Sequence, residues 1–169
     1  MKKQKLFTLL LALALTAGVL LLGCTPEDKN AIDWTMRAWV VSLDGQLAEE
    51  MDISVTGEIY TADGKTYLPL DIRTPDAFPY FYEKPDQCVP ISISGETDGL
   101  TYYVWQGYSI DRQQSDARFG SYALCPEKGW LIMRWNEDSQ RCLVASRDAN
   151  ADPGEILEYF QAFLELYGT

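Results

Sequence analysis

Histidine is absent from the 169 residues of this chain. Catalytic triads and dyads with an imidazole base, HExxH zinc sites and imidazole metal ligation are therefore excluded. The chain also lacks Ser-x-x-Lys, Gly-x-Ser-x-Gly and glycine-rich phosphate-binding motifs, so we expect no cofactor. A hydrolase of this sequence would have to use two carboxylates, which glycosidases hold about 5 to 10 Å apart. No such pair stands out among the 25 acidic residues.

Basic residues are few, because 14 Lys and Arg stand against 25 Asp and Glu and leave a net charge of -11. This negative charge argues against a nucleic-acid partner and against electrostatic adhesion to anionic lipid. A cationic ligand or surface would be attracted by it. A solvated acidic exterior is the simpler explanation of the same composition.

The N-terminal segment has the pattern of a targeting signal. Lys2, Lys3 and Lys5 precede an uncharged apolar run over residues 6–22, and the run ends in Leu-Leu-Gly-Cys at residues 21–24. This ending resembles the lipobox of bacterial lipoprotein precursors. The resemblance implies a signal peptide over residues 1–23, cleavage before Cys24 and a diacylglyceryl group on the Cys24 sulfur. The alternative is an uncleaved anchor, since the run lies at the lower edge of membrane-spanning length.

The resemblance also predicts where the protein works. A lipidated Cys24 would hold it on the outer side of a cell membrane or in the outer envelope, and Thr25 leaves open which membrane this is. A single acyl chain binds a protein to a membrane only weakly, whereas two or more chains anchor it stably. We expect residues 24–31, with Pro26, to form a short tether, and residues 32–169 to form a single domain.

Alternating apolar and polar residues predict a β-rich domain. Met51, Ile53 and Val55 alternate with polar neighbours, and Asp63-Gly64 and Asp98-Gly99 are typical of hairpin turns. Pro69 predicts an edge position or a bulge, because proline cannot donate to a ladder. About eight short strands at regular spacing predict one antiparallel β-barrel or sandwich. The expected strands are residues 34–43, 51–60, 67–72, 89–94, 100–108, 117–124, 130–135 and 141–146.

The C-terminal segment predicts one amphipathic α-helix over residues 153–167. Asp152 is placed as the N-cap and Pro153 as the first helical residue. Ile156, Phe160 and Phe163 recur at helical spacing, so this face should pack on the sheet. Eight strands followed by a helix resemble the layout of calycins and lipocalins, although the Gly-x-Trp of lipocalins is missing near the first strand.

Three cysteines remain if Cys24 carries lipid, which is too few for a four-cysteine zinc site. One disulfide is expected outside the cytoplasm. If consecutive strands run up and down, Cys88 and Cys142 lie at the same end of the sheet and Cys125 lies at the other. We therefore predict that Cys88 and Cys142 form the disulfide.

Two aromatic groups are candidate contact surfaces for a protein, peptide or glycan partner. The first is the loop over residues 74–87, with Phe78, Tyr80, Phe81 and Tyr82. The alternative is that Phe78 and Phe81 fold back and fill the core beneath the loop. The second group is Tyr103 and Trp105, which share one strand face. If Leu100, Tyr102 and Val104 face the core, these two rings lie on the outer face, where such rings more often cover a neighbouring element than bind a ligand.

Asp148, Asn150 and Asp152 have the spacing with which calcium-binding loops begin. The resemblance to an EF-hand then ends, because Pro153 stands in place of the required glycine and Tyr159 in place of the bidentate glutamate. Helix capping explains Asp152 without a metal, so calcium binding is the weaker hypothesis and no metal is expected.

The sequence supports three hypotheses of different classes. The first is a lipid-anchored extracytoplasmic binding or interaction module that uses the aromatic groups. The second is a structural envelope lipoprotein that docks onto a protein assembly. The third is a carboxylate-dependent hydrolase, and catalysis is the least expected of the three. An apolar cavity would favour the first hypothesis and a flat exposed aromatic patch the second.

Overall fold

The computed structural model describes residues 30–75, 81–82, 89–91, 93–110, 117–135 and 138–167. The leader with Cys24, the loop residues Phe78 and Tyr80, and Cys88 lie outside these ranges. The lipidation site and most of the predicted aromatic loop therefore stay predictions. None of the helices in the described ranges is long and apolar enough to cross a membrane.

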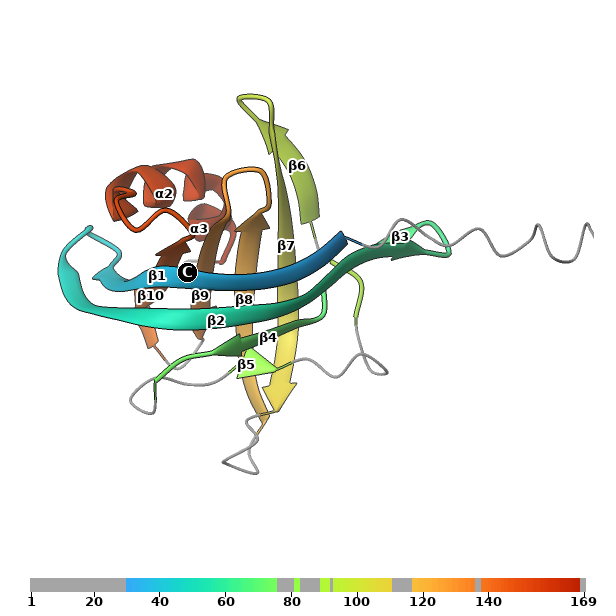
Figure 1. The fold of residues 1–169 in the computed structure, drawn as a ribbon, viewed down its shortest axis with the longest axis horizontal. Helices are drawn as coiled ribbons and strands as arrows, with labels where there is room; N and C mark the ends of the chain where they lie inside the picture. Colours follow the sequence, from blue (N-terminus) through green and yellow to red (C-terminus); the bar gives the residue numbers. More distant parts are fainter. Residues whose placement is uncertain are drawn as a thin grey trace, which may run out of the picture.

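The described residues form one antiparallel sheet and two short helices (Figure 1). Along the sheet the strands follow the order β5-β4-β2-β1-β10-β9-β8-β7-β6, and β3 pairs with β2 off this path. The helices are α2 (Pro153–Tyr159) and α3 (Gln161–Tyr167). The strands are β1 (Asn30–Ser42), β2 (Leu47–Ala62), β3 (Lys65–Tyr67), β4 (Leu70–Arg73), β5 (Phe81–Tyr82), β6 (Ile93–Thr97), β7 (Leu100–Ile110), β8 (Ala117–Cys125), β9 (Trp130–Trp135) and β10 (Asp138–Ser146).

The predicted fold class is confirmed: the protein is mainly β, and its antiparallel sheet forms a half-barrel with C-terminal helices. The sheet is a meander in two runs, which are joined where β1 pairs with the last strand, β10. Figure 1 shows β1 and β2 passing in front of the upright strands β7 to β9. The sheet therefore curls so that its two runs face each other.

Local turn chemistry forms the hairpins where the sequence predicts them. Asp63 and Gly64 have positive φ angles of 52° and 72°, and Asp98 and Gly99 have 52° and 76°. The tight two-residue hairpin turn requires a positive φ at both of its central residues, and Asp-Gly is a preferred pair for it. Pro69 lies between β3 and β4, where the predicted strand is interrupted.

The inner face of the sheet is filled by its own side chains. Met36, Ala38 and Val40 of β1 point to this face together, as their alternation predicts. The Tyr122 hydroxyl donates a hydrogen bond to the carbonyl of Leu68, so β8 is tied to the segment before β4. Other buried residues of this core are Ile32, Met51, Ile53, Val55, Ile59, Leu70, Ile72, Trp105, Leu124, Leu131, Met133, Leu143 and Ala145.

The outer face of the central strands carries a second core beneath the two helices. Ile156, Phe160 and Phe163 are buried against it, as the helical spacing predicts. Asp152 caps α2, because its Oδ1 accepts a hydrogen bond from the Gly154 amide at 2.8 Å. Other buried members of this core are Trp39, Val41, Val104, Ala123, Cys125, Trp130, Ile132, Cys142, Val144 and Leu157.

The prediction of one continuous helix over residues 153–167 is wrong. Phe160 separates α2 from α3 with a ψ angle of 16°, outside the helical range. Hydrogen bonds still cross the break, since the Phe160 amide donates to Ile156 at 3.1 Å and the Leu164 amide to Phe160 at 3.0 Å. The Phe160 side chain is only 2% exposed. The bend therefore lies at Phe160, whose buried ring packs at the junction between the two helices.

Candidate functional site

A cleft of about 570 Å³ opens between three elements: the β6–β7 hairpin, the β8–β9 turn and α2. In Figure 1 the orange β8–β9 turn lies between the two helices and the tip of this hairpin. The pairing of β7 with β8 brings the hairpin and the turn to the same end of the sheet, and α2 reaches them because the helices fold back over the outer face. The cleft is lined by Thr97, Asp98, Leu100, Lys128, Trp130, Glu155, Glu158 and Tyr159.

Gly129 shapes the β8–β9 turn on one side of the cleft. Its φ angle of 63° lies in the left-handed region, which residues with a Cβ atom rarely adopt. Its amide donates to the Pro126 carbonyl at 3.1 Å, and its own carbonyl accepts from the Arg147 amide at 3.0 Å. The turn is therefore held at both ends. Its neighbours Lys128 and Trp130 consequently have fixed backbone positions in the cleft wall.

Tyr159 is the centre of the aromatic floor. Its ring meets the Trp130 ring edge-on, with the centroids 5.5 Å apart and an interplanar angle of 71°. A second edge-on contact joins it to Tyr102 at 6.4 Å. The Tyr159 hydroxyl donates a hydrogen bond to the Leu100 carbonyl at 3.1 Å, which links α2 to β7. Aromatic pairs in this geometry are stabilising beyond their buried area, so the floor is held in place without a ligand.

Burial keeps the polar groups beneath the floor uncharged. Burial is the main cause that raises the pKa of the Tyr159 phenol, and the neighbouring Cys125 thiol raises it further. The pKa of Cys125 is raised as well, chiefly by burial. Its sulfur lies 3.7 Å from Glu127 Oε2. Because the thiolate is the reactive form of cysteine, Cys125 is a poor nucleophile at neutral pH.

Charged side chains line the cleft above this floor. Asp98, Glu155 and Glu158 are exposed acids on two of its sides, and Lys128 is an exposed base on the third. The Lys128 ammonium lies 5.2 Å from the centroid of the Trp130 ring, within the range of a cation–π contact. The lining therefore carries more negative than positive charge, and one cation already uses an aromatic face.

Comparisons with protein-family models, curated proteins and solved structures find no match to this chain. The arguments about function therefore rest on the residues of the cleft and on the sequence.

The prediction that Trp105 lies on an exposed outer face is wrong. Trp105 is 1% exposed and stacks on Tyr122 in the inner core, with centroids 5.2 Å apart. Tyr103 packs partly buried against the same core. Val104, on the opposite side of β7, is buried beneath the helices. The curl of the sheet encloses one face and the helices cover the other, so both faces of β7 are covered and Trp105 is inaccessible to a partner.

The aromatic loop is described only at β5, where the backbone of Phe81 pairs with Ile72 and that of Tyr82 with Asp71. This pairing places the end of the loop at the edge of the sheet beside β4. In Figure 1 β5 lies at the lower ends of β7 and β8, whereas the β8–β9 turn that borders the cleft lies at the upper end of these strands. The structure therefore does not bring β5 of the aromatic loop to the cleft.

The predicted disulfide between Cys88 and Cys142 stays a prediction. Cys142 is a free cysteine, and Cys88 lies outside the described residues. Cys142 is buried on β10 between the sheet and the helices, and burial raises the pKa of its thiol to about 12. A partner would have to enter this packed layer to reach its sulfur.

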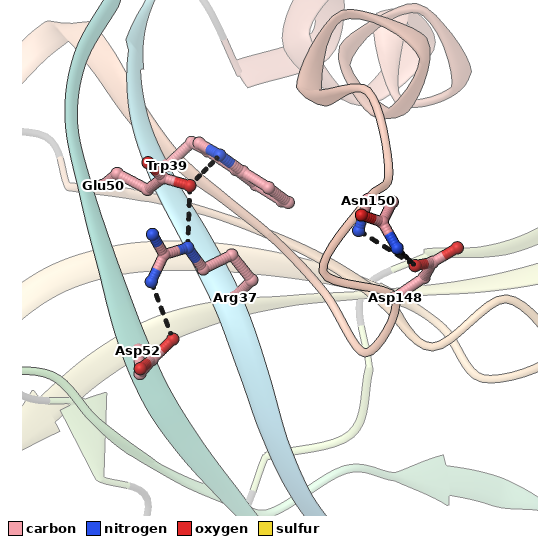
Figure 2. Close-up of polar contacts among 6 residues, drawn as sticks. All are labelled: Arg37, Trp39, Glu50, Asp52, Asp148 and Asn150. Atoms are coloured by element: carbon pink, nitrogen blue, oxygen red, sulfur yellow. Dashed lines mark hydrogen bonds and ion pairs between the residues drawn. The ribbon is translucent and has the colours of Figure 1, made fainter.

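The carboxylates proposed for calcium serve the backbone before α2 instead. Asp148 Oδ1 accepts a hydrogen bond from the Asn150 amide at 2.9 Å, and the Asn150 side chain lies beside it (Figure 2). Asp152 caps α2 as described above. Among the described residues no group of three or more acidic or cysteine side chains is arranged to hold a metal.

A second polar group lies on the exposed side of β1 and β2 (Figure 2). Arg37 donates from Nε to Glu50 at 2.7 Å and from a terminal nitrogen to Asp52 at 3.1 Å. The Trp39 indole donates to the same Glu50 oxygen at 3.2 Å. These contacts hold the pKa of Glu50 below its ordinary value, chiefly through the Arg37 hydrogen bond. Each of the four side chains has a partner within the group, which favours a structural role.

The cleft is not among the features predicted from the sequence. Two signals in the sequence point towards it. Tyr159 is an aromatic residue just outside the apolar stripe of the helix, and Trp130 directly follows a glycine in a turn. Each signal is weak alone, because nothing local shows that the two rings meet.

Proposed function

We propose that this protein is a lipid-anchored extracytoplasmic binding module and that the cleft is its ligand site. The observation that carries the proposal is the cleft itself, whose volume of about 570 Å³ lies within the range of small-molecule sites. Its aromatic floor is held by ring contacts and by the Tyr159 hydrogen bond before any ligand arrives. A preformed site loses less conformational entropy on binding.

The chemistry of the cleft supports binding rather than catalysis. No imidazole is present in the chain. The phenol of Tyr159 and the thiol of Cys125 both have raised pKa values, so neither provides an anionic nucleophile near neutral pH. The three carboxylates of the lining are exposed to solvent, whereas the general acid of a glycosidase lies in an apolar environment that raises its pKa. The groups of the cleft are therefore suited to fixing a ligand by charge, by hydrogen bonds and by aromatic contact.

The lipid anchor is supported by the sequence at residues 21–24 and is compatible with the position of the cleft. β1 starts at Asn30, soon after Cys24. Figure 1 shows β1 starting beside the β2–β3 hairpin, whereas α2, which bounds the cleft, lies near the other end of β1. A tether at Cys24 would therefore leave the cleft accessible to solutes.

Metabolic labelling with palmitate tests the anchor. We expect label on the parent chain and none on a Cys24→Ala variant, which should also stay uncleaved. A Ser42→Ala variant serves as the matched control, because it removes a single side-chain heteroatom elsewhere in the chain. Equal labelling of Cys24→Ala and the parent would contradict the anchor.

Fluorine NMR tests the cleft as a ligand site. The full chain, labelled with fluorotryptophan and held in detergent micelles, has five tryptophans, and Trp130→Phe assigns the signal of the cleft. A panel of cationic, anionic and neutral small molecules should include compounds that shift the Trp130 signal and leave that of Trp34 unchanged. If no compound in the panel shifts Trp130 selectively, the proposal is wrong and docking onto a protein assembly becomes the better hypothesis.

A further inference from the structure

We infer that the ligand of the cleft is an aliphatic diamine in its doubly charged ammonium form. This inference rests on the proposed function and names the ligand class for the same site. Three features carry it: the charge of the lining, the side on which each charge lies, and the cation that already occupies one aromatic face.

The lining charge selects for a cation of more than one charge. Asp98, Glu155 and Glu158 provide three carboxylates, and Lys128 offsets one of them. Two negative charges are thus left for a ligand, and the net charge of -11 on the whole chain adds attraction at long range. An anionic ligand would meet repulsion from three of the four charged groups.

The carboxylates lie on two separate elements, and apolar side chains line the same cleft. Asp98 belongs to the tip of the β6–β7 hairpin, whereas Glu155 and Glu158 belong to α2. Leu100 and the ring of Tyr159 line the cleft with them. A molecule with a cation at each end and methylene groups between them would match this arrangement. Its apolar segment would gain from burial on the aromatic floor.

Lys128 shows that the floor accepts an ammonium group. Its Nζ lies 5.2 Å from the Trp130 centroid, and its side chain is exposed at the turn that Gly129 shapes. The four-carbon stem can turn towards solvent and leave the indole face to an ammonium group of the ligand. Lys128 therefore acts as an internal competitor for the site, and its removal should strengthen the binding of a diamine.

Calorimetric titration of the full chain in detergent micelles tests the inference with three probes of the same carbon length. These are putrescine as the dication, succinate as the dianion and butanediol as the neutral molecule. We expect putrescine to bind and to shift the Trp130 fluorine signal, and we expect succinate and butanediol to leave that signal unchanged.

Two variants give effects of opposite sign. Lys128→Met keeps the apolar stem and removes the competing charge, so putrescine should bind about threefold tighter, the size expected for one exposed cation–π contact. Glu158→Gln should weaken putrescine binding by about threefold. Glu49→Gln removes one exposed charge on β2, away from the cleft, and should leave the affinity nearly unchanged.

The outcomes separate the ligand class from the proposed function. Preferential binding of succinate, or weaker putrescine binding by Lys128→Met, would overturn the diamine. If putrescine does not bind while another compound of the panel shifts Trp130, the diamine is wrong and the binding module stands. If no compound shifts Trp130, both proposals are wrong.

Discussion

A side chain at Gly107 should destabilise the protein as long as Trp105 occupies the inner core. A Cβ atom built at Gly107 would lie 2.6 Å from Cζ2 and 2.8 Å from Cη2 of the Trp105 ring. Non-bonded carbon atoms prefer about 3.5–4.0 Å, so the overlap is about 1 Å. The Trp105 ring is stacked on Tyr122 and has no free space into which to move.

The expected cost of Gly107→Ala follows from two opposing terms. Overpacking of a filled core costs about 1–3 kcal/mol. The backbone at Gly107 is not in the left-handed region, so alanine also restricts the unfolded chain and contributes a gain of about 0.4–1 kcal/mol. We therefore expect Gly107→Ala to lower the free energy of unfolding by about 1–2 kcal/mol. In a Trp105→Phe background the clashing atoms are absent, and the same substitution should be neutral or stabilising.

A double-mutant cycle measures this coupling. Urea unfolding of the parent, the two single variants and the double variant, followed by circular dichroism, should give an interaction energy of about 1–2 kcal/mol. Gly95→Ala is the matched control. A Cβ atom there would lie 2.5 Å from the Tyr102 hydroxyl and 2.7 Å from Cζ of the same ring, but this ring is half-buried and can shift at the cost of its edge-on contact with Tyr159. Gly95→Ala should therefore cost less than Gly107→Ala.

Additive effects of the two substitutions, within about 0.5 kcal/mol, would show that the Trp105 ring does not lie against Gly107. The placement of Trp105 in the inner core would then be wrong. The exposed outer position expected from the sequence would become the better description.

Three further predictions follow from single sites. Gly129→Ala should lower the free energy of unfolding by about 1 kcal/mol in urea titrations. The backbone there is left-handed, and the Arg147 Cδ atom would lie 2.6 Å from the new Cβ. An unchanged free energy of unfolding would contradict the left-handed conformation of Gly129. The Arg37 hydrogen bond holds the pKa of Glu50 below 4.5, so its contribution to stability is present above that pH and is lost as the pH falls through the lowered value; a Glu50→Gln variant should lack this component in unfolding measured against pH. The Cys142 thiol, with its pKa raised to about 12, should react with a thiol reagent only after urea unfolding, and rapid labelling of the native protein would disprove its burial.

Local interactions explain the parts of the fold that the sequence predicts. Asp63-Gly64 and Asp98-Gly99 form turns because the two residues themselves tolerate positive φ angles. Asp152 caps α2 because its side chain reaches an amide two residues away. These features need no knowledge of distant segments, so sequence patterns are sufficient for them.

The wrong predictions concern how the elements pack against one another and not where the strands lie. Trp105 was expected to face solvent because Val104 faces a core, but a curled sheet whose other side is covered by helices buries both faces of one strand. No proline or glycine marks the break at Phe160, where tertiary packing coincides with the bend. The cleft depends on segments near residues 98, 129 and 158 coming together, and no local pattern reports this.

The pairing of β1 with β10 has a consequence for the order in which the chain folds. Arg37 opposes Ser146 across this pair, more than a hundred residues further along the chain. β1 therefore keeps an unpaired edge until the last strand has arrived, and both cores stay incomplete. Such long-range pairing is typical of domains that fold in milliseconds to seconds. A chain truncated before β10 would expose a long hydrophobic strand edge, the feature that most favours aggregation.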